Sequence, residues 1–170
     1  LGTQPHNVWP YVELQRTAPP PTPKLHGLTN PEAFSFVGSA WYTPAEKFEK
    51  ARFSDYTDTK PGTEMATGGW ISMLQHHFLT AWVPAPTRAQ QFLTSVDQVG
   101  GQPLYRIRSI AAPLSVAPGT QASNQSRLWV GPKLQAPLVA IEPNLDRSLD
   151  YGKLYFISQP LFKYVLRPLH

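Results

Sequence analysis

The chain has 170 residues and a net charge of +4, and it contains no cysteine, which excludes disulfides, thiol nucleophiles and thiolate metal ligands. Its 19 prolines and 11 glycines argue against an all-helical bundle, while its apolar content of 41% supplies one hydrophobic core. Residues 151–170 hold Lys153, Lys163 and Arg167 and no acidic residue, so positive charge gathers at one end and does not predict a nucleic-acid partner.

The first part of the chain is predicted to be mostly β-strand. Apolar and branched residues predict strands within 8–14 and 36–42, and the prolines of 19–23 predict an extended surface loop between them. Residues 69–83 are rich in aromatic and branched side chains and are bounded by glycines and prolines. A single long buried strand is expected there.

A short helix is predicted in the middle of this β region. Thr43 provides an N-cap hydroxyl, Pro44 suits the first helical position, and Glu46 stands at the third, which together form the capping-box pattern. Residues 47–52 would then form the body of the helix.

The second part of the chain changes character after about residue 131. Alternating runs at 104–110 and 128–130 lie between turn clusters, the spacing expected of an antiparallel sandwich. Pro137 can open a helix that Pro143 and Asn144 would close, so 132–170 is predicted to be mainly helical.

No group of residues predicts an active site. His76 and His77 are adjacent, and neighbours on a strand face opposite ways, so they are not expected to share a metal ion. The Asp pairs 55/58 and 146/150 fit loop and capping roles. Nucleophile-elbow, phosphate-loop and dinucleotide motifs are absent from the sequence. We therefore expect no catalytic residue, no metal and no cofactor.

The end of the chain predicts a basic amphipathic helix. Its apolar residues recur at helical spacing on one side, and its basic residues lie four apart on the other. Such a helix can lie in a membrane interface with its cations near lipid headgroups, or it can dock on its own domain. The residues concerned are Leu161, Phe162, Lys163, Val165, Leu166 and Arg167.

Three separated segments resemble the periplasmic domain of the YidC family of membrane protein insertases from Gram-negative bacteria. They are 43–50 (TPAEKFEK), 68–84 (GGWISMLQHHFLTAWVP), and a later stretch that runs from 128–134 (LWVGPKL) to 156–163 (FISQPLFK). The segments occur in the family's order, and the resemblance covers about 36–170.

The resemblance implies a mainly β fold, a β-supersandwich similar to galactose-mutarotase-like folds, closed by C-terminal α-helices. It divides the chain into a sandwich portion, 1–131, and a helical segment, 132–170, that leads toward the transmembrane insertase core. It also implies that an anchor and the opening strands of the sandwich precede residue 1. The insertase core is then expected to follow residue 170.

The function that the resemblance implies is a non-catalytic scaffold and contact domain. Its place would be the periplasmic face of the bacterial inner membrane, within a multi-pass protein that assists insertion and folding of membrane proteins, alone or with the Sec translocon. The implied partners are SecDF and other Sec translocon components and nascent membrane proteins. Lipid headgroups would meet the C-terminal helix.

Two alternatives belong to other classes. A carbohydrate- or peptide-binding module would use exposed aromatic rings as stacking platforms. The candidate cleft aromatics are Trp41, Tyr42, Trp70 and Trp82, with Trp129 beside them. A mutarotase-like enzyme would need a histidine and a carboxylate that face one pocket.

Overall fold

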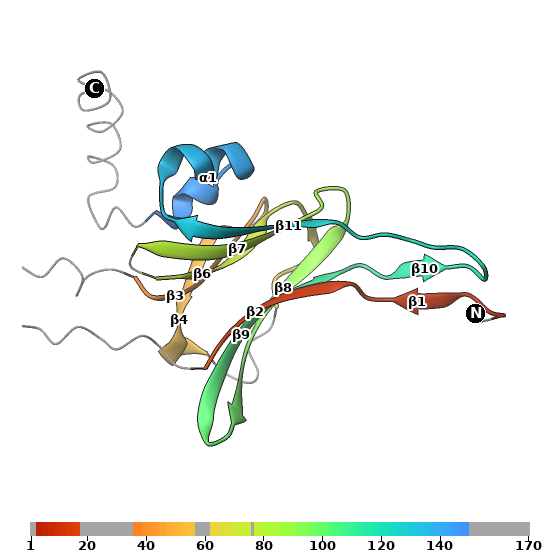
Figure 1. The fold of residues 1–170 in the computed structure, drawn as a ribbon, viewed down its shortest axis with the longest axis horizontal. Coiled ribbons are helices and arrows are strands. Elements are labelled where there is room, and N and C mark those ends of the chain that lie inside the picture. The colour runs from red at the N-terminus through yellow and green to blue at the C-terminus, as the bar shows by residue number, and fades with distance from the viewer. Residues whose placement is uncertain (1–2, 18–35, 57–61, 76, 150–170) are drawn as a thin grey trace, which may run out of the picture.

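A computed structural model describes residues 3–17, 36–56, 62–75 and 77–149. Its strands form two facing antiparallel sheets and a two-stranded ribbon that extends away from them (Figure 1). The prediction of a mainly β sandwich is therefore confirmed.

The smaller of the two sheets has four strands in the order β2-β9-β8-β5. Their bounds are β2 Tyr11–Arg16, β5 Ala66–Thr67, β8 Ala89–Val99 and β9 Gln102–Ala111. Gly100 and Gly101 connect β8 to β9 with φ angles of 59° and 77°. Two consecutive residues with positive φ are what a tight hairpin requires, so the glycines fix the register Val99 to Gln102.

The larger sheet has five strands in the order β11-β7-β6-β3-β4. Their bounds are β3 Gly38–Thr43, β4 Lys47–Arg52, β6 Trp70–Leu74, β7 Phe78–Pro84 and β11 Ser126–Pro132. The ribbon pairs β1 His6–Val8 with β10 Leu114–Val116. The strands predicted within 8–14, 36–42, 104–110 and 128–130 are confirmed, whereas the loop predicted at 19–23 lies outside the described residues.

The five-stranded sheet contributes side chains to a packed core on each of its two faces. One face packs on the four-stranded sheet, where a core forms that includes Trp41, Ile71, Phe92 and Ile107. The other face is covered by α1 (Gln135–Ile141) and by the 3-10 helix η3 (Leu145–Ser148), which insert Leu138 and Leu145 into a second core around Trp70. The sheet therefore forms the middle layer of three (Figure 1).

The single strand predicted over 69–83 was wrong, because this region is the two strands β6 and β7 of a hairpin. A strand covered on both faces carries apolar side chains in both directions, so alternation cannot mark where it ends. Gly69 precedes β6 with a φ of 98°, and a Cβ at this position would lie 2.1 Å from the carbonyl oxygen of Tyr42. That close approach requires glycine.

The helix predicted over 47–52 was also wrong, because these residues form β4. The Thr43 hydroxyl accepts the Glu46 N–H at 2.9 Å, as an N-cap would, but Lys47 then takes a φ of 66° and the chain turns back as a hairpin. Phe48 packs its ring 5.9 Å from that of Trp70, and Ala51 is buried in the core between the sheets. Burial on the sheet thus overrides the local helix signal.

The helix predicted from Pro137 is confirmed as α1, which begins two residues before Pro137 and ends at Ile141, ahead of Pro143. Asn144, with a left-handed φ of 70°, is the residue from which η3 begins. No helix within the described part of the chain is long and apolar enough to cross a membrane. Residues 150–170, with the predicted amphipathic helix, lie outside the described residues.

Candidate binding cleft between the two sheets

The two facing sheets differ in width, and the difference leaves an apolar strip uncovered. The five-stranded sheet ends with β11, which lies beyond β7, whereas the four-stranded sheet ends with β2. β2 reaches only as far as β7, where the Trp82 indole N–H donates to the Glu13 carbonyl at 3.3 Å. Among the described strands, none covers the face of β11 that points toward the smaller sheet.

Three large apolar side chains are exposed on this overhanging face. The register pairs Val130 with Thr80 and Leu128 with Trp82, so the β11 side chains share the face of β7 that points toward β2. Val130 is 68% exposed, Phe78 57% and Leu128 51%. Exposed apolar side chains that gather on one face mark a candidate contact surface.

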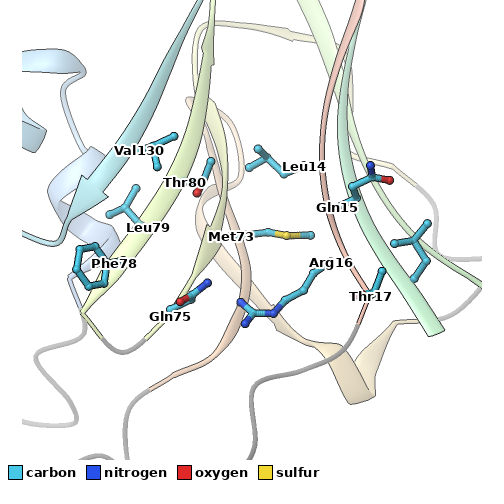
Figure 2. Close-up of a pocket in the computed structure, with 11 residues that line it drawn as sticks. Leu14, Gln15, Arg16, Thr17, Met73, Gln75, Phe78, Leu79, Thr80 and Val130 are labelled. Atoms are coloured by element: carbon cyan, nitrogen blue, oxygen red, sulfur yellow. The ribbon is translucent and has the colours of Figure 1, made fainter. Parts of the chain in front are cut away.

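The overhang opens into a cleft of about 860 Å³ between β2 and the β6–β7–β11 side of the larger sheet. Figure 2 shows side chains from both sheets directed toward this space, with Leu14 and Arg16 on one side and Met73 and Thr80 on the other. The lining residues are Leu14, Gln15, Arg16, Thr17, Met73, Gln75, Phe78, Leu79, Thr80, Leu104 and Val130.

The lining of the cleft combines apolar side chains with several polar ones. Leu14, Met73 and Val130 contribute hydrocarbon and thioether surface, and Gln75 and Thr80 can donate and accept hydrogen bonds. Arg16 is the one charged side chain among the lining residues. Its position follows from strand alternation, which places it on the same face of β2 as Leu14.

The predicted cleft aromatics are distributed over both faces of the larger sheet. Trp70 is fully buried on the helix-covered face, with the Tyr42 ring stacked at 6.5 Å, and Trp41 is 8% exposed between the sheets. Trp82 is half-buried against the core between the two sheets, and Trp129 is half-buried against the core beneath the helices. The structure thus does not bring these rings together as one stacking platform.

A smaller hollow of about 310 Å³ lies away from the main cleft and involves Trp41. It is lined by Trp41 together with Glu46, Glu49, Thr63 and Phe92, among others. Within the residues that the structure describes, no group of three or more His, Cys, Asp or Glu could hold a metal ion. The residues of the predicted amphipathic helix, Leu161 to Arg167, lie outside the described part of the chain.

The residues that line the main cleft were not predicted from the sequence. Leu128, Trp129 and Val130 form a short apolar run, which predicts a strand but does not say which of its faces is covered. That depends on the relative width of two sheets, which arises from long-range pairing. The exposed apolar face of β11 is therefore visible only in the folded chain.

Comparisons with protein families and with individual proteins point to the same family. The model of the YidC periplasmic domain matches residues 1–164. The membrane protein insertase YidC of Stenotrophomonas maltophilia strain K279a is 41% identical over 174 residues, which cover 99% of this chain and 29% of that protein. YidC of Xanthomonas axonopodis pv. citri strain 306 is 42% identical over 171 residues, covering 98% and 28%. The chain spans less than a third of the length of these relatives.

Proposed function

The chain belongs to the YidC periplasmic domain family, and from this premise we propose that it is a non-catalytic scaffold and contact domain of a membrane protein insertase. As a member of that family it is a periplasmic domain, on the outer side of the bacterial inner membrane. In the proposed role it assists insertion and folding by holding and contacting other chains. That task requires no covalent chemistry.

The observation that supports this role best is the cleft with its uncovered apolar face. Segments of an inner-membrane protein that emerge beside the membrane carry apolar side chains whose exposure to water is unfavourable. Val130 and Phe78, at the mouth of the cleft, provide accessible apolar surface against which such segments can pack. We therefore place the proposed contact with nascent membrane proteins at this cleft.

Two further contacts are part of the proposal. Sec translocon components, SecDF among them, are proposed as protein partners through the family resemblance. Lipid headgroups are proposed to meet the basic side of the C-terminal segment, where Lys163 and Arg167 lie four residues apart.

Photo-crosslinking in the complete insertase tests the proposed contact. A photoreactive phenylalanine analogue replaces Val130 in the cleft or, as the matched control, Val99 at the β8–β9 hairpin, which is 53% exposed and does not line the cleft. We expect a nascent inner-membrane protein to be labelled from position 130 and not from position 99. Absence of labelling at 130, or equal labelling at both positions, would contradict the proposal.

A further inference from the structure

We propose that the helix layer is the side of the domain that faces the membrane, so that the outward face of α1 contacts the lipid interface and the four-stranded sheet is turned away from the bilayer. This inference rests on the lipid contact proposed for the C-terminal segment and adds a second surface to it. Three features carry it, namely the side chains around α1, the absence of charge along α1 and the charge of the residues that follow.

The helix α1 carries apolar side chains on both of its sides. Leu138 is fully buried against the five-stranded sheet. Ala136, Val139 and Ala140 lie at helical spacing on the side away from Leu138, and all three are exposed. Leu134, directly before the helix, is 55% exposed. A surface helix normally presents polar side chains to water, and a helix that is apolar all round is normally buried. The outward face of α1 is therefore expected to be covered in the complete protein.

No charged side chain interrupts this outward face. Residues 134–141 contain no Lys, Arg, Asp or Glu, although these types make up 15% of the chain. Glu142 supplies the first carboxylate after the helix, and the Arg127 guanidinium binds it at 2.9 Å. A helix that lies in a membrane interface places apolar side chains at the boundary of the acyl chains and keeps its charges away from that side. The outward face of α1 meets this requirement.

The charge of the neighbouring residues favours a lipid surface as the cover. Residues 151–170 follow η3 in the chain and hold Lys153, Lys163 and Arg167 with no acidic residue. Anionic lipid headgroups attract such a basic stretch, and the attraction acts only close to the membrane surface. A short stretch of chain joins α1 to these basic residues, so a lipid surface that attracts them also lies within reach of α1.

The order of the layers turns this contact into an orientation of the whole domain. α1 packs on one face of the five-stranded sheet, and the four-stranded sheet packs on the other (Figure 1). With α1 on the lipid, the β8–β9 hairpin and its Val99 lie on the side away from the bilayer. The five-stranded sheet then separates the cleft from the lipid. A segment that reaches Val130 in the cleft has therefore already left the membrane.

The outward face of α1 is too small to hold the domain at a membrane by itself. Leu134 and Val139 are its only large side chains among the exposed ones of residues 134–141, and even a whole acyl chain gives only marginal membrane binding on its own. The chain truncated after Asp150 is therefore not expected to bind vesicles. In the complete insertase the domain is held beside the bilayer, so the effective concentration of lipid at α1 is high.

Site-specific fluorescence in the complete insertase tests the proposal. The 170-residue chain has no cysteine, so a Val139→Cys substitution in an otherwise cysteine-free insertase carries a single nitrobenzoxadiazole label. The matched control is Val99→Cys, because Val99 is 53% exposed and Val139 is 48% exposed. Each protein is reconstituted into vesicles of phosphatidylethanolamine and phosphatidylglycerol. We expect emission from position 139 to move to shorter wavelength and to lose intensity when spin-labelled lipid is included, while emission from position 99 does neither.

The other outcomes overturn the proposal and identify what is wrong. Equal quenching of both labels would refute the orientation. Emission from position 139 that is shifted to shorter wavelength but not quenched by spin-labelled lipid would show that a protein segment covers α1. A third label, at Lys163→Cys, separates this inference from the proposed function. Quenching at 163 but not at 139 would leave the lipid contact of the C-terminal segment standing and refute the role of α1, whereas absence of quenching at both would refute the two contacts together.

Discussion

Truncation of Leu138 to alanine should remove a large part of the domain's free energy of unfolding, because this side chain packs α1 against the core. Leu138 is fully buried among Trp70, Leu79 and Leu145 on the outer face of the five-stranded sheet. A buried Leu→Ala change removes hydrocarbon from the core and leaves a cavity, at a cost of about 2–5 kcal/mol. Domains are stable by only about 5–15 kcal/mol, so the loss is a large fraction of the total.

Urea denaturation followed by circular dichroism measures this effect. With a slope of roughly 2–3 kcal/mol per M for a chain of this size, the midpoint should fall by on the order of 1 M. The matched control is Val139→Ala on the same helix, where the side chain is 48% exposed and the change should cost about 0.5 kcal/mol or less. If both variants shift the midpoint equally, α1 does not share the sandwich core and the packing argument is refuted.

Three further predictions address other parts of the chain. Gly69→Ala should destabilise the fold by well over the ~1 kcal/mol expected for Gly101→Ala. A Cβ at position 69 would clash with the Tyr42 carbonyl, whereas nothing lies within 4 Å of a Cβ at position 101. Thermal unfolding of the two variants measures the difference. Burial raises the pKa of Tyr56 to about 12 from 10.0. The contribution of Tyr56 to stability should therefore be constant below pH 10 and fall as the pH rises from 10 toward 12, by up to about 1.4 kcal/mol per pH unit, and Tyr56→Phe should lack this component of the fall in alkaline urea titrations. Co-sedimentation with anionic vesicles should be lost on truncation after Asp150 and weakened by salt if the tail lies in the membrane interface, while retention by the truncated chain would argue against it.

Elements set by local backbone chemistry could be predicted from the sequence. The β8–β9 turn follows from Gly100 and Gly101, which adopt positive φ without a steric penalty. The helix α1 follows from Pro137 near its start and from Pro143, which stands two residues past its end and cannot continue a helix. In each case, residues within one turn determine the conformation.

Elements set by long-range packing could not be predicted in the same way. Thr43 makes the same hydrogen bond to Glu46 that a helix cap would make, and only the packing of Phe48 on Trp70 decides that a strand follows. The β6–β7 hairpin could not be recognised from the sequence because both strands contribute side chains to both cores, so neither shows a simple apolar–polar alternation. The local sequence thus predicted the hydrogen bond between Thr43 and Glu46, but tertiary contacts determined the structure of the residues that follow.

The candidate cleft lies entirely in this second class. Val130 looks like any strand residue in the sequence, and its 68% exposure arises because the partner sheet ends one strand earlier. Likewise, Leu14 and Arg16 line the cleft because β2 is the last strand of its sheet, which the sequence does not show. The cleft therefore depends on which strands form the edges of the two sheets, and this is set by long-range pairing.

The energetics of this cleft favour reversible binding. Covering Val130 and Phe78 would be favourable by about 25 cal/mol for each Å² of apolar surface removed from water. Against this stands the entropy lost when an unfolded segment is ordered in the cleft, which offsets much of the gain from a short interface. We therefore expect weak affinity for an isolated peptide. A contact domain of an insertase has to release the segments that it holds, and a partner already held at the membrane reaches the cleft at a high effective concentration, so weak binding is sufficient for the proposed role.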